Sequence, residues 1–231
     1  MDYQPRTIAF HAELLHAPLS PDPRPVQKFH NEMFEGGRPV YASFAVTPVG
    51  PILANPGNRP GAVSQVACLA DRLQFREELG GLTPEGFAER VQHVATRLAS
   101  AAGIPLFTGQ QVTLRSLVNP RRFRDAREFL KVAMFRFGGE TEAFGREPAL
   151  YGLRLLFPPA ADEANAFALR IESYNSDTRS LFVETQGTFG PAPTASDPGS
   201  SALGERVLET YRFLLERALP FVARFDVRQE A

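Results

Sequence analysis

Two amphipathic helical segments constrain the fold of this chain more than any other feature. Each follows a group of segments in which apolar and polar residues alternate. The first begins with a capping residue and a first-turn proline, Thr83-Pro84, and ends at Gly103, with apolar residues every three or four positions between them. A second helix is expected over about 203–219. In the preceding segments apolar and polar residues alternate, as in half-buried strands. The pattern predicts an α+β fold: a curved antiparallel sheet with helices on one face.

The predicted elements follow the order β-α-β-β-β-α twice. The halves would span 6–103 and 106–225 within a single domain of 231 residues. Glu89-Arg90-Val91 in the first long helix corresponds to Glu205-Arg206-Val207 in the last, and the apolar stripes agree in phase. An internal duplication is one interpretation. The other is a chance match of two amphipathic helices.

Two stretches rich in turn-forming residues interrupt this pattern. Residues 187–204 are rich in Pro, Ser, Thr and Gly and predict a mobile loop. Residues 50–61 hold three prolines and two asparagines and predict a loop or an edge segment.

Three short motifs and the element order resemble known groups of proteins. Through Asp71-Arg72-Leu73-Gln74-Phe75, Leu114-Arg115-Ser116-Leu117-Val118 and Gly152-Leu153-Arg154, the layout resembles a sporadically distributed bacterial family of unknown function. The element order is similar to the duplicated units of gyrase-inhibitor-like effector-binding domains, and this resemblance implies a small-ligand cleft between the halves. Neither resemblance carries a catalytic motif, so no functional residue is transferred.

Composition and cysteine usage exclude several chemistries. The net charge of −1 argues against a general polyanion binder, and the lone Cys68 can form neither an intrachain disulfide nor a multi-cysteine metal site. Only Lys28 and Lys131 are lysines among 25 basic residues, so the chain is better suited to holding anions than to Schiff-base chemistry. No apolar run reaches the roughly 18 residues of a membrane helix, and no signal-peptide pattern opens the chain. We therefore expect a cytoplasmic protein with no membrane partner.

Catalytic patterns are absent or incomplete. No phosphate-binding loop, dinucleotide fingerprint or nucleophile elbow occurs, and we predict no cofactor and no metal. His11-Ala12-Glu13 matches only half of the zinc-deaminase signature. An enzyme site assembled from His11, Glu13 and His30 is left as an alternative.

The strongest local charge signal is basic and lies between positions 115 and 136. A helix after Pro120 is expected there, with four cations opposite its apolar stripe: Arg121, Arg124, Arg127 and Lys131. Such a face could bind a nucleic acid or an acidic partner. The alternative is a solvated face neutralised by local pairs with Asp125 and Glu128 at i,i+4 spacing.

Two further surfaces could make contacts. Arg170, Glu172, Tyr174 and Glu184 are expected to line the open face of the sheet, where a ligand could bind. Phe213 is expected on the polar side of the last helix, covered by the chain after Pro220 or exposed as an interface.

Three functional hypotheses follow. The first is a non-catalytic binding protein that recognises a small molecule or a protein partner through the sheet face and a groove between the halves. The second is binding of nucleic acid or an acidic partner through the basic region 115–136. The third is an enzyme whose site lies outside known motifs.

Overall fold

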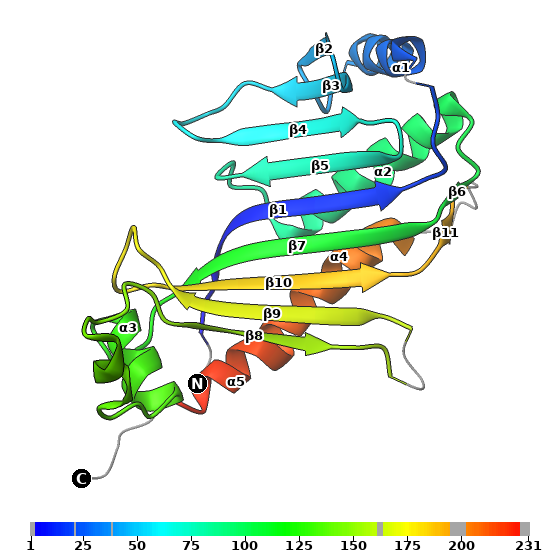
Figure 1. Ribbon diagram of the computed structural model, residues 1–231. Coiled ribbons are helices and arrows are strands. Elements are labelled where there is room, and N and C mark those ends of the chain that lie inside the picture. The colour runs from blue at the N-terminus through cyan, green and yellow to red at the C-terminus, as the bar shows by residue number, and fades with distance from the viewer. Residues whose placement is uncertain (1–2, 21, 38, 161–163, 195–201, 227–231) are drawn as a thin grey trace.

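A nine-stranded antiparallel sheet forms the body of the molecule in the computed structural model, which describes residues 3–20, 22–37, 39–160, 164–194 and 202–226 (Figure 1). The strand order is β2-β3-β4-β5-β1-β7-β10-β9-β8. The strands are β1 (Arg6–Leu15), β2 (Ser43–Thr47), β3 (Gly50–Asn55), β4 (Val63–Cys68), β5 (Arg72–Glu78), β7 (Gly109–Val118), β8 (Gly152–Phe157), β9 (Ala166–Ser173) and β10 (Leu181–Phe189). A small second sheet pairs β6 (Leu106–Phe107) with β11 (Ala192–Pro193). The α+β prediction is confirmed.

The main helices lie on one face of this sheet (Figure 1). Asp22 caps α1 (Pro23–Glu35) and Thr83 caps α2 (Pro84–Ala102), and each helix has a proline in its first turn. Gly103 ends α2 in the left-handed conformation, at φ 69°. The last helix is α4 (Ala202–Phe213), continued by a π-helical segment (Leu214–Ala218) and α5 (Leu219–Ala223). The bounds of α2 and the start of α4 agree with the helices predicted from capping and periodicity, whereas the last helix continues to Ala223, beyond its predicted end at 219.

Apolar residues at every second position of the strands form the core between the sheet and the helices. Leu14, Phe75 and Leu114 are fully buried, and the ring of Phe10 stacks on that of Phe87 from α2 at 5.2 Å. The same alternation turns the intervening residues to the other face of the sheet.

Apart from the edge strand β2, the sheet order is symmetric about the pair β1 and β7. These strands pair antiparallel, and β5, β4 and β3 on one side occupy the places of β10, β9 and β8 on the other. Helices α2 and α4 approach closely, because a Cβ on Gly204 would lie 3.0 Å from the carbonyl oxygen of Ala88. These two residues directly precede the matched Glu-Arg-Val segments of the two helices. A common origin of the halves remains a prediction.

Two expected loops contain strands. Residues 50–55 form β3, an inner strand paired on both sides, with Leu53 fully buried, and the first half therefore holds one strand more than predicted. Residues 187–189 complete β10 and 192–193 form β11, whereas 195–201 lie outside the described residues. The mobile-loop prediction is wrong at 187–189, where Gly187 fits tightly between the side chains of Thr210 and Phe189.

The helix predicted directly after Pro120 does not form. Its first turn is replaced by irregular chain, since the carboxylate of Asp226 accepts hydrogen bonds from the N–H groups of Arg121 (2.7 Å) and Arg122 (3.0 Å). Helix α3 (Ala126–Glu128) begins later, at the cap Asp125, and continues as a π-helical segment over Phe129–Met134.

Candidate functional site

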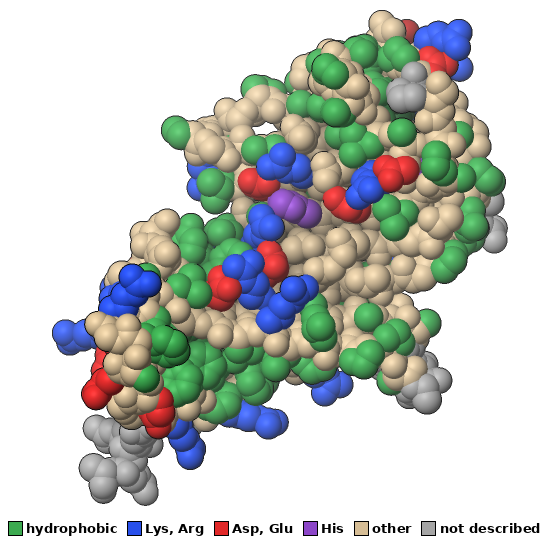
Figure 2. Space-filling view, in the orientation of Figure 1, with side chains coloured by type: hydrophobic (Ala, Val, Ile, Leu, Met, Phe, Trp, Pro, Cys, Tyr) green, Lys and Arg blue, Asp and Glu red, His purple; other side chains and the backbone are tan. Residues whose placement is uncertain are grey.

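The sheet face opposite the helices has no covering layer among the described residues. Directly opposed residues of antiparallel strands point to the same side, so the strand register places a continuous set of polar side chains on this open face. Figure 2, which looks onto it, shows basic and acidic side chains gathered around a histidine near the middle. We call the following residues the open-face ladder: His11, Glu13, Arg72, Gln74, Arg76, Glu78, Thr113, Arg115, Arg170, Glu172 and Glu184.

His11 lies at the centre of the ladder. Its Nε2–H donates to Glu78 Oε1 at 2.9 Å, and Arg76 donates to the same oxygen at 2.7 Å. Desolvation and then the Arg115 guanidinium lower the pKa of His11, against the opposing effect of Glu78. The imidazole is therefore biased towards its neutral form and is 22% exposed.

The rest of the first-half ladder is also paired. Glu13 accepts hydrogen bonds from Gln74 Nε2 at 2.7 Å and from Arg72 Nη1 at 3.1 Å. Arg72 also makes two hydrogen bonds to the neighbouring carboxylate of Asp71. These paired charges present hydrogen-bonding groups in fixed positions.

The second half continues the ladder, and here the predicted sheet-face residues lie together. Arg115 Nε donates to Glu184 Oε2 at 2.7 Å, and Arg170 makes two hydrogen bonds of 2.6 Å to Glu172. Tyr174, directly after β9, stacks on Phe182 with 6.3 Å between ring centroids. The predicted set Arg170, Glu172, Tyr174 and Glu184 thus shares one face. Residues of β1, β5 and β7 join it, among them His11 and Glu13, which were predicted only as part of an enzyme site.

His30 lies away from His11 and Glu13. It belongs to α1, where its ring contacts those of Phe34 (4.8 Å) and Phe44 (6.1 Å). The predicted cluster of His11, Glu13 and His30 is therefore not formed, because α1 packs on the other side of the sheet edge. Among the described residues, no group of three His, Cys, Asp or Glu side chains could hold a metal ion.

The basic region 115–136 does not form a single charged face. Arg121 stacks over the ring of Tyr3 at 5.5 Å, in the irregular chain that also holds the exposed Arg124. Arg127 Nη2 lies 3.6 Å from Asp125 Oδ2, and Lys131 Nζ donates a hydrogen bond to Glu147 Oε1 at 2.9 Å. The helical array expected of Arg121, Arg124, Arg127 and Lys131 is wrong, since the first two precede α3.

Phe213 faces the sheet and not the chain after Pro220. Its ring stacks on Phe167 of β9 at 4.5 Å and 4° and meets the edge of Phe157 of β8 at 5.5 Å. The placement on the polar side of the helix is wrong, because β8 and β9 extend beneath this position and supply two aromatic partners.

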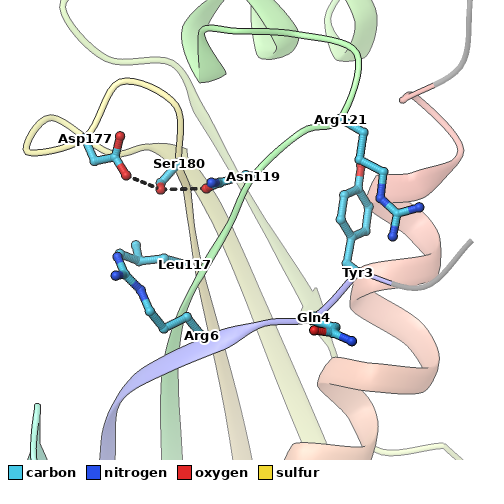
Figure 3. A pocket seen from close by; sticks show the side chains of 8 residues that line it. All are labelled: Tyr3, Gln4, Arg6, Leu117, Asn119, Arg121, Asp177 and Ser180. Atoms are coloured by element: carbon cyan, nitrogen blue, oxygen red, sulfur yellow. Dashed lines mark hydrogen bonds between the residues drawn. The ribbon is translucent and has the colours of Figure 1, made fainter.

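The predicted groove between the halves is occupied by paired backbone, because β1 and β7 are hydrogen-bonded along their length. A polar pocket of about 470 Å³ lies instead at one end of this junction, where β1 begins and β7 ends (Figure 3). Arg6, Asn119 and Arg121 are among its lining residues. Ser180 Oγ lies 2.7 Å from Asp177 Oδ2 and 2.8 Å from Asn119 Oδ1, so these polar groups are already engaged with one another.

A buried ion pair escaped the sequence analysis. Glu77 of β5 is 4% exposed and accepts hydrogen bonds from Arg90 of α2 and, at 2.8 Å, from Ser64 Oγ. Burial raises the pKa of Glu77, against the opposing effect of Arg90. The sequence did hold a signal for this pair: Glu77 is an acidic residue at an inward position of a strand whose residues alternate between the two faces. The pair lines a pocket of about 230 Å³ beside the turn at Gly80.

The comparisons with known proteins leave the chain without an assigned family. No protein-family model and no curated protein sequence matches it. Within the described ranges, the helices are too short or too polar to cross a membrane.

Proposed function

We propose that the chain is a non-catalytic binding protein whose open face recognises a protein partner. The observation that carries this proposal is the open-face ladder itself: charges of both signs spread across β5, β1, β7, β10 and β9, and no layer formed by the described part of the chain covers them. A surface of fixed, paired charges offers directional hydrogen bonds over a wide area, which suits specificity towards a partner with complementary charges.

The breadth of the ladder favours a protein over a small molecule. The described pockets lie at the margins of the sheet, and the centre around His11 is a continuous polar surface. Small ligands bind in concave, mostly apolar sites, whereas protein interfaces are broad and rimmed by polar groups. Alternation of charge sign disfavours nucleic acid, which requires a predominantly basic surface. A cytoplasmic location is part of the same proposal.

Photo-crosslinking with matched positions tests the proposal. A photoreactive residue replaces Thr113, opposite His11 on the open face, and in a second protein replaces Arg97, exposed on α2. In a lysate of the cells that produce the protein, we expect a discrete adduct from position 113 and none from position 97.

Competition makes the test specific for the ladder. Excess unlabelled wild-type protein should abolish the adduct, whereas the charge-swapped variant Arg115→Glu with Glu184→Arg, which keeps the net charge, should compete at least tenfold less well. Equal competition by the swapped variant, or equal adducts from positions 113 and 97, would show that the open face is not the binding surface.

A further inference from the structure

An apolar pocket lies at the opposite end of β1 from the polar pocket of Figure 3. After β1, residues 16–20 cross the ends of the strands. His16 N–H donates to Asp71 O at 2.9 Å and Leu19 N–H to Ala70 O at 2.8 Å. Beneath this crossing segment, between α1 and the end of α2, lies a pocket of about 360 Å³. Its volume falls within the range of small-molecule sites.

The lining is apolar and reaches the core. Ten of the fourteen lining residues are Leu, Ile, Val, Pro or Ala, among them the buried Leu73, Leu98 and Ile104. Cys68 adds a thiol whose pKa burial raises to about 12, so that it stays neutral. Such walls favour an apolar ligand body.

One lining residue offers a directional hydrogen bond. His16 is 6% exposed, and its Nδ1–H donates to Ala17 O at 2.8 Å, because a carbonyl oxygen can only accept. In the neutral ring the remaining nitrogen, Nε2, therefore carries the lone pair. Within the described residues this nitrogen has no hydrogen-bond partner and is not fully buried, so it can accept a hydrogen bond from a ligand.

The charges beside the pocket are already paired, which favours a neutral ligand over a charged one. Asp22, which also lines it, is held ionised by Arg24, whose hydrogen bonds lower the pKa of that carboxyl. Asp71, beside His16 in the turn, is likewise held ionised by hydrogen bonds from Arg72. Each carboxylate is thus neutralised by its own arginine, and neither is left to pair with a charged ligand.

We infer that this pocket binds a neutral apolar molecule with a single hydroxyl group, an alcohol or a phenol, whose O–H donates to His16 Nε2. The site is separate from the open face, on the helix side of the sheet. The inference stands independently of the proposed function.

The probes are 4-butylphenol and butylbenzene, which differ only in the hydroxyl group. In titrations of the full chain at pH 8, we expect 4-butylphenol to bind with a submillimolar Kd and at least fivefold more tightly than butylbenzene. Ala102→Leu, which fills the pocket at the last residue of α2, should weaken both at least tenfold. Ala223→Leu, at the last residue of α5, is the matched control and should change neither.

The hydrogen bond is tested separately. His16→Phe keeps an aromatic ring but removes the hydrogen-bond acceptor. The ratio of the Kd of butylbenzene to that of 4-butylphenol should therefore fall towards one. Because this variant could fail to fold, the ¹⁵N resonance of His16 Nε2 in the wild-type protein provides a second readout: it should shift with 4-butylphenol and stay in place with butylbenzene. Equal affinities for the two probes, binding that survives Ala102→Leu, or an unmoved Nε2 resonance would overturn the inference.

Discussion

Arg90→Met should destabilise the fold through the charge that it leaves behind on Glu77. Glu77 is 4% exposed and the Arg90 side chain 19% exposed, so water can replace little of the lost interaction. Breaking a buried ion pair costs about 3–5 kcal/mol. Because Ser64 Oγ remains as a donor to Glu77, we expect the lower end, about 3 kcal/mol. At about 2–4 °C per kcal/mol for a chain of this size, Tm should fall by roughly 6–12 °C.

Chemical denaturation of two matched variants measures the effect. Arg97→Met removes an arginine from the same helix, where its pair with Glu32 is exposed and worth at most about 1 kcal/mol. The double variant Glu77→Leu with Arg90→Met removes both charges and should recover most of the loss.

The pH dependence gives a second criterion. Since burial raises the pKa of Glu77, the protonated acid is favoured in the fold, and the stability linked to this group is lost as the pH rises. Removal of Arg90 raises this pKa further. The loss caused by Arg90→Met should therefore be largest at pH 7 and shrink towards pH 4. A loss no larger than that of Arg97→Met, or one unchanged at pH 4, would refute the reasoning.

Three further predictions concern packing, titration and thiol reactivity. Gly187→Ala should cost about 1–3 kcal/mol in urea unfolding, because the added Cβ would lie 2.4 Å from a neighbouring hydroxyl, whereas Gly190→Ala, with nothing within 4 Å, should cost much less. The imidazole of His11 should titrate below 6.5 by NMR, so the folding stability linked to this group is present at neutral pH and is lost as the pH falls below 6.5. Arg115→Gln should raise the pKa of His11, and an unchanged titration in this variant would contradict the assigned cause. Cys68, with its pKa raised to about 12, should react with a thiol reagent at pH 8 at least a hundredfold more slowly than in urea-unfolded protein, and equal rates would contradict the raised pKa.

The alternation of residues was sufficient to predict the sheet and its covered face. Strand periodicity and caps such as Thr83 are local signals, and they gave the main helices and most strands close to their observed bounds. The irregular chain after Pro120 was not predictable in this way, because a carboxylate about a hundred residues away, that of Asp226, holds its N–H groups.

The candidate site was predictable only in part. Arg170 and Glu184 were placed on the open face only because successive side chains of a strand alternate between its two faces. The structure brings them together because β9 pairs with β10. Their continuation to His11 across β7 and β1 depends on strand order, which periodicity does not specify. The hydrogen bond proposed for His16 could not be predicted from periodicity, because His16 lies in a crossing segment without regular structure.

The most direct test of the central claim is the accessibility of two histidines in the complex of the wild-type protein with the partner identified through the adduct at position 113. His11 lies at the centre of the open face, and His93 is exposed on α2, on the helix side. Carbethoxylation rates are measured for both rings in the free protein and in the complex. The account predicts that partner binding slows modification of His11 at least tenfold and leaves His93 unchanged. An unchanged rate at His11 in the complex would contradict it.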